Sequence, residues 1–148
     1  MKPSSSFTHI HQLKAGDGTN EDAPIITITP RAGNPEKIEI IHTGNTVVTT
    51  LNKVKIVDLA PFKGTWVEVT EKVTYKTVGS IDLTIKKVSD GTVLVSYTNN
   101  NIDMWRDGAT FVRPKWGIYR SLNNVASLRD EEVWFADFCI AEGNAICQ

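Results

Sequence analysis

The chain of 148 residues contains only two cysteines, Cys139 and Cys147, and no apolar run near the ~18–20 residues that a membrane-spanning helix needs. It also lacks an excess of either charge, with 16 basic and 17 acidic residues and a net charge of −1. Proteins that bind nucleic acid by neutralising phosphates usually carry a basic excess. The sequence therefore predicts no membrane span and no nucleic-acid partner. The two cysteines either form one disulfide or leave Cys139 as a core thiol.

The sequence also shows no secretory leader and no N-glycosylation signal. Residues 1–6 (MKPSSS) have no apolar stretch after Lys2, so they do not form a secretory signal. No Asn-x-Ser/Thr acceptor is present. Hydrophobic residues make up 41% and charged residues 22%, which is ordinary for a globular domain of this size. We expect one domain over residues 1–148.

Long helical patterns are scarce, and short runs of β-branched residues separated by turn signals take their place. Asp90-Gly91 is one such signal and predicts a hairpin. A short helical turn is plausible only within 122–130. The alternation of side chains predicts nine strands, over residues 7–13, 24–29, 37–42, 54–59, 65–75, 80–88, 93–97, 115–121 and 132–140. This pattern predicts an all-β protein with a jelly-roll β-sandwich fold.

Two of these predicted strands carry polar side chains that could perform chemistry. In a strand, residues two apart share a face. We therefore expect Lys115 and Tyr119 on one face of their strand, with Gly117 between them, and His9 and His11 together on one face of theirs. A sheet buried on both sides would not present a lysine and a tyrosine, whereas a wet binding face would. By the same alternation, Trp116 should point the other way, into the sandwich.

These residues resemble a known family, the jelly-roll polysaccharide lyases. Lys115-x-Gly117-x-Tyr119 resembles the Lys-Ala-Gly-x-Tyr strand of alginate lyases, and His9-Ile10-His11 resembles their Gln-Ile-His strand. Residues 7–140 are similar to the C-terminal part of fungal glucuronan-lyase-like and heparin-lyase-like proteins. The Arg-[Ser/Thr]-Glu element of an earlier strand in the family is not found here. The resemblance thus implies a secreted, extracellular protein whose domain is incomplete at its N-terminus.

The resemblance implies β-elimination on a polymer that contains uronic acids, with no cofactor and no metal. His11 matches the family histidine that neutralises the carboxylate or acts as base, and Tyr119 matches the tyrosine that serves as acid. A lysine on the face of Tyr119 would stabilise the phenolate. The side chains expected to bind the acidic polysaccharide are His9, Arg113, Lys115 and, by stacking on a sugar ring, Trp105.

Other functions remain open from the sequence. A carbohydrate-binding β-sandwich without chemistry would use the same fold. A glycoside hydrolase of the laminarinase type would need a Glu-x-Asp-x-x-Glu element, which residues 130–137 do not match. An incomplete sandwich could also be inert, because open sheet edges favour aggregation. For a chain that folds, we expect a monomer whose partner is an acidic polysaccharide.

Overall fold

The computed structural model describes residues 1–46, 51–143, 145 and 147. Two short 3-10 helices, η1 (Ala60–Phe62) and η2 (Val125–Ser127), accompany the strands. The strands are β1 (Thr8–Ala15), β2 (Ile26–Arg31), β3 (Lys37–His42), β4 (Asn52–Asp58), β5 (Val67–Thr74), β6 (Gly79–Lys87), β7 (Val93–Ile102) and β8 (Val112–Arg120).

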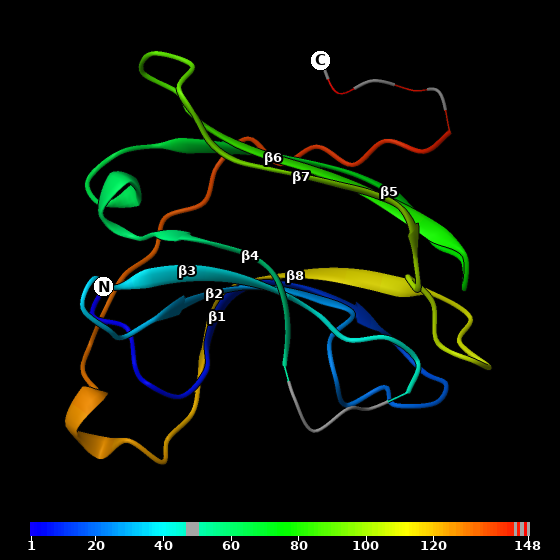
Figure 1. Cartoon of the computed structure of the whole chain (residues 1–148), viewed down its shortest axis with the longest axis horizontal. Coiled ribbons are helices and arrows are strands. Elements are labelled where there is room, and N and C mark those ends of the chain that lie inside the picture. The colour runs from blue at the N-terminus through cyan, green and yellow to red at the C-terminus, as the bar shows by residue number, and fades with distance from the viewer. Residues whose placement is uncertain (47–50, 144, 146, 148) are drawn as a thin grey trace.

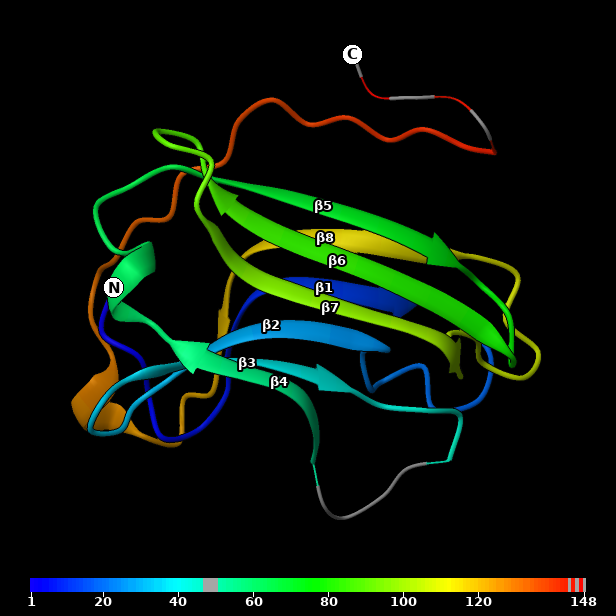
Figure 2. The ribbon, with the colours of Figure 1, turned by 45° about the horizontal axis from the view of Figure 1, so that its top comes forward.

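The strands form two antiparallel sheets that pack face to face as a β-sandwich (Figures 1 and 2). One sheet has five strands in the order β4-β3-β2-β1-β8, and the other has three in the order β5-β6-β7. The predicted all-β sandwich is confirmed. Because β1 and β8 are neighbours, the segments that carry the two sequence motifs lie side by side.

Alternating apolar side chains from both sheets fill the space between the layers. On β6, Ile81, Leu83 and Ile85 are nearly inaccessible to solvent, and on the facing sheet Ile28 and Ile40 lie directly opposite each other. These residues belong to one contiguous core cluster. Burial of such side chains stabilises the fold by roughly 1.5–3 kcal/mol each. We call the side of each sheet that contacts this core its inner face, and the other side its outer face.

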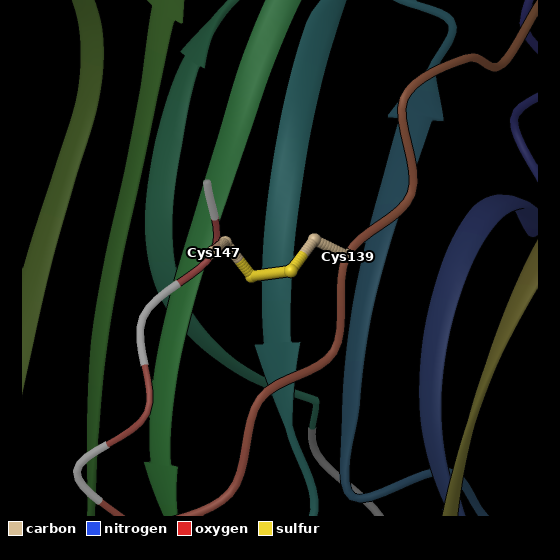
Figure 3. Close-up of a disulfide and its surroundings, with 2 residues drawn as sticks. All are labelled: Cys139 and Cys147. Atoms are coloured by element: carbon tan, nitrogen blue, oxygen red, sulfur yellow. A yellow bond between two sulfur atoms is a disulfide. The ribbon is translucent and has the colours of Figure 1, made fainter.

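The predicted strand over 132–140 is wrong. Residues 128–143, named here the C-terminal segment, run extended past β5 and join neither sheet (Figures 1 and 2). Its contacts with the sheets include side-chain pairs, such as Trp134 with Trp66 and Phe138 with Trp116. A sequence that favours extended structure forms a strand only where a partner backbone is in reach, and among the described residues this segment finds none. The cysteines are bridged, Cys139 to Cys147 (Figure 3).

The turns near β7 also test the sequence predictions. The Asp90-Gly91 hairpin is confirmed, since Gly91 has a φ of 71° and the Thr92 amide donates to Asp90 Oδ1 at 2.9 Å. In contrast, β7 continues to Ile102 instead of ending at residue 97. β7 is an edge strand of its sheet, so the polar run 99–101 can continue the ladder with its side chains in solvent.

Candidate functional site

The two sequence motifs lie on adjacent strands, with a β-bulge between them. In the β1–β8 pair, His9 lies opposite Tyr119. His11 lies opposite Trp116, so three steps along β8 accompany two steps along β1. The additional residue falls at Gly117, whose φ of 140° is accessible without strain only to glycine. The rule that side chains two positions apart share a face therefore does not hold across this part of β8.

The bulge separates Lys115 from Tyr119. Lys115 lies opposite Gln12, and Gln12 is the chain neighbour of His11, so the two point to different faces. Residues directly opposite in an antiparallel pair share a face. Tyr119 therefore shares the inner face with His9 and His11, whereas Lys115 lies on the outer face. The prediction that Lys115 and Tyr119 share a face is wrong.

Trp116 also departs from its expected direction relative to Tyr119. Its ring stacks on His11 with centroids 5.5 Å apart, and it contacts Phe138 of the C-terminal segment at 4.7 Å. Trp116 lies on the inner face, as predicted, but Tyr119 shares that face, so the prediction that the two point in opposite directions is wrong. Because the bulge adds one residue to β8, Trp116 and Tyr119 point to the same face although they are three positions apart.

His11 is committed to protein contacts at both ring nitrogens. Its Nε2 lies 2.8 Å from Glu71 Oε2 of β5, and its Nδ1 lies 3.1 Å from the carbonyl oxygen of Lys115. Nε2 faces a carboxylate and Nδ1 faces a carbonyl oxygen, so both ring nitrogens are engaged by protein groups. The side chains of His11 and Glu71 are 7% and 15% exposed. With both ring nitrogens occupied and little exposure, His11 is placed as one half of a buried His–Glu pair between the two sheets.

A second group of rings surrounds His9. The Phe7 and His9 rings stack with centroids 5.0 Å apart, and the Tyr119 ring lies 5.2 Å from Phe7 and 6.1 Å from His9. Tyr119 is 62% exposed, whereas Nδ1 of His9 is buried without a hydrogen-bond partner among the described residues. Burial, and then the nearby charge of Arg31, lower the pKa of His9 to about 4. At neutral pH His9 is thus a neutral imidazole and offers no charge to a carboxylate.

This lowered pKa predicts a pH dependence of stability that His9→Gln removes. The folded state binds fewer protons than the unfolded chain between the pKa of about 4 and the ordinary pKa of 6.5. The stabilisation is therefore complete above pH 6.5 and is lost as the pH falls toward 4. Because His9 is only half-buried, we expect roughly 1–2 kcal/mol rather than the full linkage value. Urea unfolding at several pH values measures it, and identical pH profiles for both proteins would contradict it.

Arg113 and Lys115 belong to a cluster of positive charge on the outer face. Arg113 lies opposite Lys14 and shares the face of Lys115, two residues along β8. Partial burial lowers the pKa of Lys115, and the charges of Arg113 and Lys14 lower it further. Among the described residues, no carboxylate lies within 4.0 Å of any of these three cations. We call Lys14, Arg113 and Lys115 the basic cluster.

Polar side chains extend from the basic cluster across the outer face. Gln12 and Thr27 are 6% and 4% exposed, and Nε2 of Gln12 and Oγ1 of Thr27 have no hydrogen-bond partner among the described residues. At the far side, Glu39 neutralises Lys53 at 2.7 Å and Arg31 at 3.3 Å. The cross-strand row formed by these strands consists of Lys115, Gln12, Thr27, Ile41 and Lys53.

Trp105 lies in a different part of the fold from the motifs. It belongs to the connection between β7 and β8, where its amide donates to Asp103 Oδ1 at 3.2 Å. The neighbouring Arg106 is completely buried and donates through Nη2 to the carbonyl oxygens of Thr43 at 2.8 Å and Ala23 at 3.3 Å. These contacts give the Trp105 region the role of joining three chain segments at one end of the sandwich.

Sequence reasoning missed Glu71, Gln12 and Lys14. Glu71 had a detectable signal, because it occupies the phase of Val69 and Val73 in β5 and so interrupts an apolar face with a carboxylate. A charged residue in an apolar phase predicts a buried partner. Lys14 and Gln12 alternate with the histidines of β1, and only the pairing with β8 joins them to the other cations.

Metal-ligand groups, helix length and comparison with known proteins do not assign a function to this chain. Within 1–46, 51–143, 145 and 147, no three or more His, Cys, Asp or Glu side chains are grouped to hold a metal. In the same part of the chain, no helix has the length and apolarity to cross a membrane. Comparison with protein-family models, with curated proteins and with solved structures finds no match.

Proposed function

We propose that this protein is a carbohydrate-binding β-sandwich that holds an acidic polysaccharide on the outer face of its five-stranded sheet. The observation that carries the proposal is the basic cluster of Lys14, Arg113 and Lys115, three cations without carboxylate partners in the described structure. Their mutual repulsion is relieved when a carboxylate approaches. A chain of uronic acids presents such carboxylates at regular intervals.

The polar residues beside the cluster suit hydroxyl groups of sugars. Gln12 and Thr27 lie next to each other on the outer face, and each has a buried polar atom without a partner in the described residues. A buried polar atom left unpaired costs about 1–3 kcal/mol, which a sugar hydroxyl could recover. Cations for carboxylates and amide or hydroxyl groups for sugar hydroxyls are the two requirements of acidic-polysaccharide binding.

Replacing all three cations tests the proposal. We expect Lys14→Gln, Arg113→Gln and Lys115→Gln together to weaken binding of glucuronan and alginate about 100-fold, since each exposed charged contact contributes on the order of 1 kcal/mol. Isothermal titration calorimetry at low and moderate salt measures the affinity, with dextran as the neutral polymer. Wild-type affinity should fall with salt, and the salt dependence should be weaker in the triple variant.

The matched control removes the same charge from β6 and from the turn between β5 and β6, on the other side of the sandwich. Lys76→Gln, Lys86→Gln and Lys87→Gln together change the net charge equally but leave the outer face of β1 and β8 intact. We expect this control to bind both acidic polymers within about threefold of wild type, because surface charges far from a site contribute little. Equal losses in both triple variants, or equal binding of dextran, would overturn the proposal.

A second candidate, polysaccharide lyase activity, is favoured by one observation. The neutral imidazole of His9 lies beside the exposed phenol of Tyr119, with 6.1 Å between ring centroids. An imidazole with an unpartnered nitrogen and a phenol are a possible base and acid for β-elimination. In this version His9, rather than His11, takes the proton, because both nitrogens of His11 are occupied.

Tyr119→Phe distinguishes the two candidates. If the protein is a lyase, this variant should lose formation of the unsaturated uronate, followed by ultraviolet absorbance, while polymer binding stays nearly unchanged. If wild-type protein binds glucuronan or alginate but yields no unsaturated product from either, the lyase candidate fails and the binding function stands alone. Loss of binding in Tyr119→Phe would contradict the placement of the ligand on the outer face.

A further inference from the structure

The edge strand β5 differs from the other three edges of the sandwich. The edges are β4 and β8 in the five-stranded sheet and β5 and β7 in the other. The pairing of β4, β7 and β8 with their neighbours is interrupted by register shifts, and β8 also contains Pro114. β5 pairs with β6 without interruption from Val67 to Thr74. Bulges and prolines protect edges from further pairing, and β5 has neither. The C-terminal segment runs past this edge, with Trp134 against Trp66, but among the described residues it makes no backbone hydrogen bond to β5, so an added strand would displace it.

The side chains of β5 leave this edge open to solvent. Glu68, Thr70, Lys72 and Thr74 on its outer face are exposed, and even Val69 on its inner face is 45% exposed. The backbone bonds of Val67–Thr74 described by the structure are those to β6 and one turn bond at Thr74. Eight residues of regular strand thus present a row of backbone donors and acceptors for an added strand.

The charge pattern of β5 is complementary to itself. When two copies pair antiparallel about a two-fold axis through Thr70, Glu68 of each lies opposite Lys72 of the other. The same register places Val67 opposite Val73. If the two-fold axis moves from Thr70 to Glu71, Glu71 lies opposite itself. If it moves to Val69, Glu68 no longer lies opposite Lys72. Only the register centred on Thr70 forms both opposite-charge pairs.

We propose that a second copy of this chain pairs through β5, in the register centred on Thr70, to form a continuous six-stranded sheet. This differs from the monomer expected from the sequence. Among the described residues of the single chain, Glu68 forms an ion pair with Lys86, at 2.7 Å and with both side chains exposed. It is therefore free to contact Lys72 of the second copy as well. Trp66, 50% exposed and next to Trp134, then gains a neighbour at Thr74 of the other chain.

Charge exchange at two positions tests the dimer and its register. Glu68→Lys places lysines opposite lysines at both crossings, and Lys72→Glu places glutamates opposite glutamates. We expect the dimer of the wild-type protein, measured by sedimentation equilibrium over a range of concentrations, to weaken at least tenfold in each single variant. The double variant restores both pairs with reversed sign and should recover most of the affinity. Thermal unfolding by circular dichroism confirms that each variant is folded.

A cross-linking variant gives a second, independent measurement. Thr70 lies on the proposed two-fold axis, where paired Cα atoms are about 4.5–5.5 Å apart, within the range that a disulfide spans. We expect Thr70→Cys to form a covalent dimer under mild oxidation, while Thr98→Cys, exposed on β7, does not. A wild-type protein that is monomeric at every concentration, or a dimer indifferent to both charge exchanges, would overturn the proposal.

Discussion

Replacing Glu71 with alanine is expected to lower the free energy of unfolding by about 3 kcal/mol, because it leaves one half of a buried ion pair without its partner. Glu71 Oε2 lies 2.8 Å from His11 Nε2, and both side chains are largely buried between the sheets. In the alanine variant, His11 has lost the acceptor for its Nε2 proton and must either carry an uncompensated charge or lose that proton. Both outcomes cost stability.

Urea unfolding of the wild-type protein and of Glu71→Ala measures this loss. Asp82→Ala is the matched control, because it lies on the neighbouring strand β6 and removes an exposed carboxylate that accepts from the Thr98 hydroxyl at 3.0 Å. We expect the control to cost less than about 1 kcal/mol. A loss in Glu71→Ala no larger than in the control would show that the His11–Glu71 pair does not stabilise the fold. Such a result would also reopen His11 as a candidate base.

A double-mutant cycle separates the pair from the loss of side-chain packing. His11→Leu with Glu71→Leu removes both charges and fills the space with apolar groups. Such replacements of buried ion pairs are often neutral or stabilising. We expect the double variant to be more stable than either single variant, with a coupling free energy of roughly 2 kcal/mol.

The sandwich itself could be predicted because most strands can be recognised from their local sequence. Side-chain alternation predicts β6, where Ile81, Leu83 and Ile85 occupy one phase and the core. The exception is the segment over 132–140. Its aromatic and β-branched residues, such as Val133, Trp134 and Phe135, favour a strand, yet it is no strand, because strand formation depends on a second backbone that local sequence does not reveal.

The candidate site was predicted less well than the fold, for a reason that lies in one residue. The bulge at Gly117 reverses the phase of β8, so Lys115 and Tyr119 diverge although their spacing predicts a shared face. Glycine in a strand indicates a possible bulge, but only the pairing with β1 fixes where the extra residue falls. The predicted binding group was therefore divided between the two faces of the sheet.

The basic cluster illustrates how net charge conceals a local charge pattern. A chain with a net charge of −1 still gathers Lys14, Arg113 and Lys115 on one side of β1 and β8. Lys14 is about a hundred residues from the other two in the sequence, so no window of local composition contains all three. Topology, which makes the first and the last strand neighbours, creates the cluster.

Replacing Arg106 with alanine should lower the free energy of unfolding by about 3–5 kcal/mol. The side chain is completely inaccessible to solvent and donates to the carbonyl oxygens of Thr43 and Ala23. Burial lowers the pKa of the guanidinium, and the nearby carboxylate of Asp103 counteracts this effect. Without Arg106, two buried carbonyl groups lose their donor and a large cavity opens where three chain segments meet.

Arg129→Ala is the control for this substitution, because the side chain of Arg129 is 50% exposed and forms an ion pair with Glu131 at 2.9 Å. We expect Arg129→Ala to change the unfolding free energy by less than about 1 kcal/mol. Arg106→Lys should recover only part of the loss, since a single ammonium cannot reproduce the fork of donors that reaches two carbonyls. If Arg106→Ala unfolds at the same urea concentration as Arg129→Ala, the junction at this end of the sandwich does not depend on Arg106. Trp105 would then be free for another role, such as the sugar contact predicted from the sequence.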